Sequence, residues 1–288
     1  MFYVLSLLCY SKARWRRTTT IEKKGGALLF LAAAVSGFLG LGAKPIVSTL
    51  PLSLLLYEWF FFQNLDPAWL KKNIRWPIIA MAAFLAMILI FLGPSPVTTI
   101  LSRYETQPFT IGQRLFTEPA VILYYLSLLL FPHPARLHLL YDFPLSDLLY
   151  SPEITALSLS ALLTLFFGGL ILCRRHKLLA FGIFWFLLTL TIESSLIGLA
   201  IAYEHRTYLP SVFPVLALVL LIHRQTGPKP FVAVLVLMVL TGSIWTYQRN
   251  QLWTDRALFW QNSVQKSPEL PATYNNFGLV LRQQGDIR

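Results

Sequence analysis

The sequence predicts an all-α, polytopic integral membrane protein with about seven full spans. Hydrophobic residues make up 56% of the 288-residue chain and charged residues only 13%, whereas soluble domains average about 45–50% and about 25%. The hydrocarbon core of a bilayer is ~30 Å thick, and an α-helix needs about 20 mostly apolar residues to cross it. Apolar runs near that length occur at 27–43, 45–62, 76–93, 154–173, 178–194, 210–222 and 230–247.

Basic residues cluster in four stretches, which predict the loops on the cytoplasmic side. More than half of the 24 Lys and Arg residues lie at 12–24, 71–75, 174–177 and 224–229. Short loops rich in Lys and Arg stay cytoplasmic, so the net charge of +11 indicates membrane anchoring. We therefore expect a multi-pass protein of the cell (inner) membrane, with membrane lipid and no nucleic acid as partner. Its C-terminal tail is expected on the external, periplasmic side.

The run at 112–131 is also apolar, but a full span there would place the basic stretch 174–177 outside. The alternation of sides therefore predicts a re-entrant or amphipathic helix with both ends external. Half-inserted backbone survives where it is buried in protein or lines a cavity. The loops 94–111, 132–153 and 195–209 are then external as well.

The first residues predict a truncated first helix. Met1–Tyr10 is apolar, but ten residues cover only about 15 Å as a helix, half a bilayer. The basic residues follow this stretch, whereas a signal peptide carries them in front of its apolar core. We therefore expect a fragment of a longer protein or a split-gene product.

The segment Glu204–Pro210 is the strongest candidate site, because it holds three ionisable side chains between two apolar runs. A charge costs roughly 2.5–3.5 kcal/mol at the centre of a membrane helix, so such residues persist where they bind a ligand or pair with one another. Tyr208 supplies an interfacial aromatic ring, and Pro210 suits the first turn of a helix. This pattern indicates a polar site for an anionic headgroup. Alternatively, Arg206 pairs with Glu204 and merely anchors the helix end.

Arginine is the side chain best suited to phosphate, because its planar fork donates two parallel hydrogen bonds. Arg206 and Arg114 are the predicted lipid-phosphate binders. Arg114 opens the re-entrant helix, where first-turn amides also favour anions; the alternative is an ion pair with Glu118, four residues on. The full predicted binding set is Arg206, Arg114, His205, Lys44, Glu204 and Tyr208.

The chain offers no recognisable catalytic or metal motif. The five histidines are scattered, and there is no Gly-rich phosphate loop or nucleophile elbow. Glu193 lies at the end of a membrane helix, where desolvation raises a carboxyl pKa and suits a general base; pairing with a nearby arginine is the alternative. We expect no cofactor, no metal and no catalytic residue in this chain.

After a membrane domain at 1–247, the composition of 248–288 becomes polar. An apolar face over 253–264 predicts a helix that Ser267-Pro268 ends. The stretch Tyr274–Gly278, closing at Gly285, matches the first helix of a tetratricopeptide repeat, in which an aromatic and a small residue one turn apart let two helices pack closely. A generic amphipathic helix with a glycine stop is the alternative.

Five stretches together resemble one family. They are Ala43-Lys44-Pro45 leading into Leu50-Pro51, Arg114–Pro119, Glu204–Pro210, Arg249-Asn250 with Trp253, and Ser267-Pro268 followed by Asn276-Phe277-Gly278. In this order they are similar to the membrane half of bacterial tetratricopeptide-repeat proteins that resemble the transmembrane-and-TPR O-mannosyltransferases, which are GT-C-like glycosyltransferases.

That resemblance implies an enzyme that moves a sugar from a polyprenyl-phosphate sugar lipid to an acceptor protein held by the repeat region. Its catalytic acidic residues are expected in the first external loop, before the point where this chain begins. One alternative is a non-catalytic membrane anchor that displays a repeat domain for protein binding. Another is an envelope polysaccharide ligase or polymerase.

Overall fold

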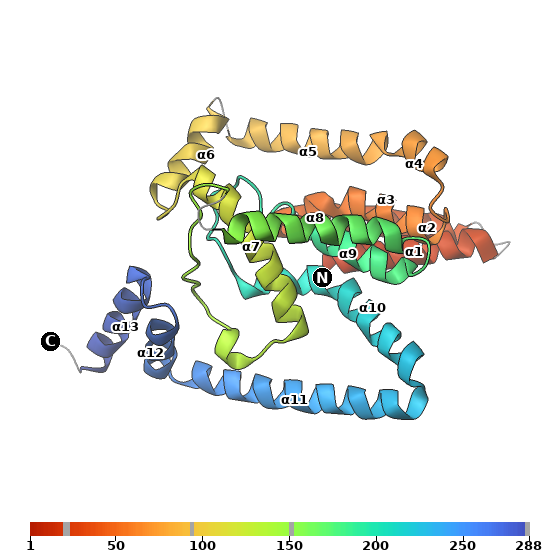
Figure 1. Ribbon diagram of the computed structural model, residues 1–288. Helices are drawn as coiled ribbons and strands as arrows, with labels where there is room; N and C mark the ends of the chain where they lie inside the picture. The colour runs from red at the N-terminus through yellow and green to blue at the C-terminus, as the bar shows by residue number, and fades with distance from the viewer. Residues whose placement is uncertain (20–23, 93–94, 150–152, 286–288) are drawn as a thin grey trace. The chain divides into compact units, whose positions relative to one another are not determined.

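The structure is a computed structural model that describes residues 1–19, 24–92, 95–149 and 153–285. These residues form helices joined by loops, without a β-strand in the described ranges, which confirms the predicted all-α fold (Figure 1). The chain forms two compact units. Unit 1 comprises 1–102 and 169–197, and unit 2 comprises 103–168 and 198–288.

Each unit is built from its own helices, and α6 (Pro96–Glu105) and α8 (Ile154–Leu172) cross the boundaries. Unit 1 contains α1 (Phe2–Thr19), α2 (Lys24–Ala43), the 3₁₀ turn η1 (Pro45–Thr49), α3 (Leu50–Phe61), α4 (Pro67–Asn73), α5 (Arg75–Leu92) and α9 (Lys177–Leu190). Unit 2 contains α7 (Ile111–Leu130), η2 (Pro134–Arg136), η3 (Glu204–Thr207), α10 (Tyr208–Thr226), α11 (Pro228–Thr254), α12 (Arg256–Lys266) and α13 (Pro271–Gln284).

Four helical segments of the described chain are long and apolar enough to cross a membrane: Gly26–Ala43, Ile154–Leu172, Glu204–Thr226 and Pro228–Thr254. Two shorter apolar helices, Pro45–Phe61 and Lys177–Leu190, coincide with two further predicted spans. The remaining predicted span, 76–93, forms α5 up to Leu92. The fold therefore defines a helical protein compatible with a membrane.

The long helix α11 shows why an apolar surrounding is required. None of its most apolar window is buried within the protein, and Leu237 and Val239 are 65% and 59% exposed. Each exposed aliphatic side chain forgoes roughly 1.5–3 kcal/mol of transfer free energy in water. A helix that is apolar all round is covered by a membrane or by the core of a larger protein.

Several predicted boundaries differ from the structure. The expected basic loop 12–24 is helical up to Thr19, because residues 11–19 are mostly good helix formers without Gly or Pro; residues 20–23 lie outside the described ranges. The predicted external loop 94–111 contains α6. Helix α9 ends at Leu190 rather than at 194, whereas the short run 210–222 extends to Tyr208–Thr226.

In unit 1, α1 is fastened to α3 by polar contacts at both ends of a shared apolar face. The Tyr3 hydroxyl donates to Ser53 Oγ at 2.5 Å, and its ring packs edge-on against Trp185 at 5.7 Å. At the other end, the buried Glu58 carboxylate accepts from Tyr10 at 2.8 Å and from Arg14 at 2.9 Å. Glu58 is not among the predicted site residues, since it lies near the predicted cytoplasmic end of its helix; Tyr10 and Arg14 lie 48 and 44 residues away in the chain.

In unit 2, α7 begins with a capping box, in which Thr110 Oγ1 accepts from the Gln113 amide and the Gln113 side chain accepts from the Thr110 amide. One turn further, the Thr117 hydroxyl accepts from the Ser146 amide at 2.9 Å. Ser146 Oγ in turn contacts Thr155 Oγ1 at 2.6 Å. These contacts fix the long loop after α7 against the first turns of α7 and α8.

The C-terminal part consists of the end of α11 and the helices α12 and α13. Helix α11 continues past the predicted domain boundary at 247/248, and Asp255 then caps α12 through the amides of Ala257 and Leu258. Helix α13 ends at Gly285, which adopts a left-handed conformation with φ 85°, as expected for a glycine stop. The helix pair α12–α13 is present (Figure 1); its assignment to a tetratricopeptide repeat stays a prediction.

Candidate functional site

The two predicted phosphate-binding arginines both lie in unit 2, where they hold one loop. Arg114, the fourth residue of α7, donates to the carbonyl oxygens of Leu199 and Ala200. Arg206, in η3, donates to the carbonyl oxygen of Ile201 at 3.0 Å. Two guanidinium groups, 92 residues apart in the sequence, therefore bind three successive carbonyl groups of one loop.

Both arginines are buried, and each has further partners. Arg114 is fully buried and pairs with Glu118 at 2.7 Å, the ion pair given above as the alternative. The Arg206 guanidinium lies 5.3 Å from the Tyr203 ring centroid, within cation–π range. A phosphate would reach these groups only after the loop carbonyls release them, so their phosphate-binding role stays a prediction.

Tyr125 connects the loop to the middle of α7. Its hydroxyl accepts from the Tyr203 amide at 2.8 Å, and its side chain is completely buried. The Tyr203 amide is partly buried, and leaving a buried amide unpaired costs about 1–3 kcal/mol. Four of the five residues of the loop 199–203 are thus hydrogen-bonded to the rest of unit 2: Leu199, Ala200, Ile201 and Tyr203.

Glu204 belongs to a neighbouring polar network of unit 2. It accepts a hydrogen bond from the Tyr141 hydroxyl at 3.0 Å, and Arg249 near the end of α11 lies 3.9 Å away. The sequence offered an ion pair between Glu204 and Arg206 as the alternative to a binding site. In the structure, Glu204 forms an ion pair with Arg249. Burial and the Glu204 carboxylate both raise the pKa of Tyr141, which therefore stays protonated and donates.

The other predicted binding residues differ in exposure. His205 is exposed and stacks on the Tyr203 ring at 5.3 Å. Tyr208, the first residue of α10, is 77% exposed, as an interfacial aromatic requires. Lys44 lies in unit 1, where it pairs with Glu193 at 3.0 Å. Glu193 thus has a lysine partner, where the sequence analysis named an arginine as the alternative to a catalytic role.

A pocket of about 560 Å³ lies next to the arginine-held loop. Its walls are four short segments of unit 2: 107–109, 140–145, 200–203 and 269–272. One wall is therefore the same loop whose carbonyl groups Arg114 and Arg206 bind. The other walls combine aromatic rings, such as Phe143, with the acidic side chains of Asp142 and Glu269. Sequence reasoning missed this pocket, because no local signal joins segments so far apart in the chain.

The loop 134–142 is bound to the turn between α12 and α13. Lys266 Nζ donates to the carbonyl oxygens of Pro134 and Leu137 at 2.8 and 2.9 Å. Ser267 Oγ donates to the Leu140 carbonyl oxygen at 2.7 Å, and the Glu269 amide donates to Asp142 Oδ2 at 3.1 Å. These contacts attach the helix pair to the loop that forms one wall of the pocket.

His138 lies within this attachment, 3.4 Å from Ser267 Oγ and stacked on Tyr141 at 4.9 Å. Burial, together with the positive charges of Lys266 and Arg249, lowers the pKa of His138 from 6.5 to about 4. Burial and Arg249 also lower the pKa of Lys266. The imidazole is therefore neutral at pH 7.

Comparisons of the chain with known protein families, curated proteins and solved structures gave no match. Within the described residues, no group of three or more His, Cys, Asp or Glu is placed to hold a metal ion. The arrangement is thus a helical, membrane-compatible protein with a pocket among its loops and a buried pair of arginines behind one wall.

Proposed function

We propose that the chain is the membrane part of a GT-C-like protein glycosyltransferase and that it binds a polyprenyl-phosphate sugar donor. The observation that carries this proposal is the pocket of about 560 Å³ in unit 2. In the proposed topology, seven helices cross the membrane and α7 is re-entrant. The pocket then opens on the external side, where the sugar-phosphate headgroup of such a lipid lies.

The chemistry of the pocket supports a polar headgroup beside an apolar chain. Phe109, Phe143 and Tyr203 offer faces for a sugar ring, and Asp142 and Glu269 offer acceptors for its hydroxyl groups. The exposed His205, stacked on the pocket residue Tyr203, offers a hydrogen-bond donor to the phosphate group. In this proposal Arg114 and Arg206 position the loop 199–203 rather than contact the donor in its resting state.

The assignment is limited to donor binding. No residue of this chain is assigned to the transfer step. The repeat-like helix pair, attached beside the pocket, would bring the acceptor protein close to the bound sugar.

Binding of a radiolabelled polyprenyl-phosphate hexose to the full chain in liposomes tests the proposal. We expect saturable binding that polyprenyl phosphate competes away and polyprenol does not. Ala272→Trp fills the pocket from the exposed start of α13 and should abolish binding. Asn275→Trp, on the same helix but not lining the pocket, is the control. Non-saturable binding, or equal binding by both variants, would overturn the proposal.

The second candidate is a membrane anchor that displays a protein-binding helical domain. The four hydrogen bonds from Lys266, Ser267 and Glu269 to the loop 134–142 favour it, because they fix the helix pair firmly to the loops. If the chain shows no saturable donor binding while hydrogen exchange confirms that the helix pair is docked, the anchor becomes the leading function.

A further inference from the structure

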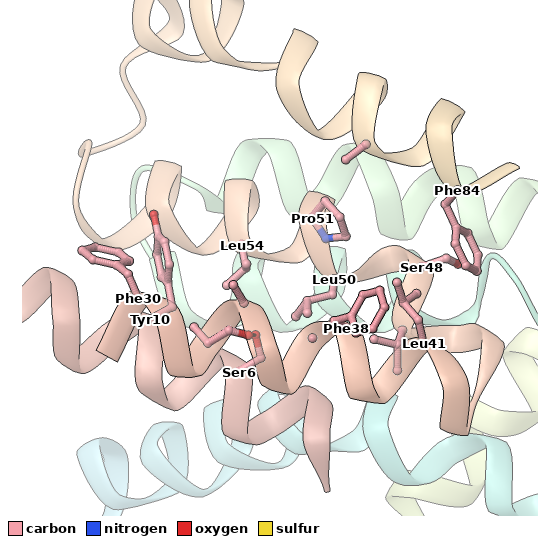
Figure 2. A pocket seen from close by; sticks show the side chains of 15 residues that line it. Ser6, Tyr10, Phe30, Phe38, Leu41, Ser48, Leu50, Pro51, Leu54 and Phe84 are labelled. Carbon is pink, nitrogen blue, oxygen red and sulfur yellow. Dashed lines mark hydrogen bonds between the residues drawn. The ribbon is translucent and has the colours of Figure 1, made fainter. Parts of the chain in front are cut away.

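Unit 1 contains a second pocket, of about 400 Å³, which is separate from the proposed donor site. Figure 2 shows its lining, with Tyr10 and Phe30 at one end and Leu41, Ser48 and Phe84 at the other. The side chains come from α1, α2, the η1–α3 segment and α5. Nearly all of them are apolar.

Three lining side chains carry polar groups: Ser6, Tyr10 and Ser48. Ser6 and Tyr10 are already hydrogen-bonded within the protein. Ser6 Oγ donates to the Ala33 carbonyl oxygen at 2.7 Å, and the Tyr10 hydroxyl donates to Glu58 at 2.8 Å. Ser48 Oγ is buried, the residue being only 6% exposed, and has no hydrogen-bond partner among the described residues. Most buried polar groups are paired, so an unpaired hydroxyl in a pocket wall indicates a missing partner.

The length of the pocket specifies what fits in it. Along α2 the lining runs from Phe30 to Leu41, and eleven residues of helix correspond to about 16 Å. Half of a bilayer's hydrocarbon core is about 15 Å, the depth that one lipid chain covers. Ala34 and Phe38 on the lining are exposed, so a chain can enter from the side of the helix layer.

Close packing within the pocket wall keeps the pocket from collapsing. A Cβ atom at Gly37 would lie 2.9 Å from Leu50 Cδ2, and one at Gly40 would lie 3.0 Å from Val47 Cγ1. The α2 backbone is therefore already in contact with η1 and α3, and neither element can move closer to fill the space.

We propose that this pocket holds one acyl chain of a bilayer phospholipid, with Ser48 Oγ donating a hydrogen bond to the ester carbonyl group at the head of that chain. In the proposed topology the turn at 44–49 is external, so the lipid belongs to the outer leaflet. The site lies entirely within unit 1 and is independent of donor binding.

Photolabelling of the full chain in liposomes tests this site. The probe is phosphatidylethanolamine with a diazirine on one acyl chain, and labelled peptides are mapped by mass spectrometry. We expect labelling concentrated on residues 30–54 and on α5. Ala34→Phe fills the pocket and should reduce labelling of 30–54 at least fivefold, whereas Val35→Phe, its exposed neighbour outside the lining, should leave labelling unchanged.

Ser48→Ala tests the hydrogen bond alone, because it removes the hydroxyl group and leaves the shape of the pocket nearly unchanged. Loss of one hydrogen bond should weaken labelling roughly two- to tenfold. Labelling spread evenly over all apolar helices, or equal labelling in Ala34→Phe and Val35→Phe, would overturn the proposal. So would displacement of the probe by a stoichiometric amount of polyprenyl-phosphate hexose, which would assign the pocket to the donor.

Discussion

The guanidinium group of Arg114 lies 2.7 Å from the carboxylate of Glu118, one turn further along α7, and both side chains are buried. An ion pair at this spacing on a helix surface contributes only about 0.2–0.5 kcal/mol. In a buried setting the pair matters differently, because removal of one partner leaves an uncompensated charge in a medium of low dielectric constant. The pair also holds Arg114 where it binds the loop carbonyls of Leu199 and Ala200.

Glu118→Gln should therefore destabilise the protein by about 3–5 kcal/mol, the range for breaking a buried ion pair from one side. Unfolding in detergent, followed by circular dichroism, measures the change. Glu105→Gln, at an exposed residue of α6, is the matched control and should change stability by less than about 0.5 kcal/mol. Equal effects of the two substitutions would show that the ion pair contributes nothing specific.

Arg206→Ala should weaken donor binding while membrane insertion stays intact. The substitution removes the hydrogen bond to Ile201 and frees the loop that walls the pocket, so amide exchange across 199–203 should become faster. Binding of polyprenyl-phosphate hexose and hydrogen exchange are measured on the same preparation, with the exposed Arg224→Ala as control. Faster exchange with unchanged donor binding would reduce Arg206 to a structural role.

The attachment of the helix pair should weaken in acid. The pKa of His138 is lowered to about 4 in the folded state, against an ordinary value of 6.5, so the folded state favours the neutral ring. Its contribution to stability is complete above pH 6.5 and is lost as the pH falls towards 4. Lys266 and Arg249 oppose protonation of the ring, and the uncharged Tyr141 and Ser267 contact it. The Glu204 carboxyl, whose pKa is raised by burial, accepts from Tyr141 beside the ring.

Hydrogen exchange across residues 266–273, corrected for the intrinsic pH dependence of exchange, measures this loosening. The asparagine side chain does not titrate, so His138→Asn should lack the transition. A transition that persists in His138→Asn would assign the acid sensitivity to another group.

Gly278 in α13 and Gly285, which follows its last residue, should respond to alanine in opposite directions. A Cβ atom at Gly278 meets open space, so Gly278→Ala gains helix propensity and should stabilise α13 by about 1 kcal/mol. Gly285 has φ 85°, and Gly285→Ala should cost about 1–2 kcal/mol. Thermal unfolding and exchange of the α13 amides measure both. A destabilising Gly278→Ala would indicate a packed neighbour, as in a stacked tetratricopeptide repeat.

Much of the helical pattern could be predicted from the sequence, because the length of an apolar run is a local property. The runs at 27–43, 154–173 and 230–247 became helices of spanning length, and Gly285 stops α13 as its backbone freedom implies. The boundaries of basic segments were predicted less well. Residues 12–19 were predicted to lie in a loop because they are rich in Lys and Arg, but these residues are good helix formers and the segment is helical. The partner of Glu118 followed from the helical repeat alone.

Only the tertiary structure decided which polar groups meet across the chain. The carbonyl groups of Leu199 and Ala200 lie 85 and 86 residues from Arg114 in the chain, and those of Pro134 and Leu137 lie 132 and 129 residues from Lys266. Such contacts depend on how the loops return to one another, for which composition and periodicity contain no information. The same reason explains why neither pocket was predicted: each is formed by side chains from separate helices and loops, and its volume is what their packing leaves unfilled.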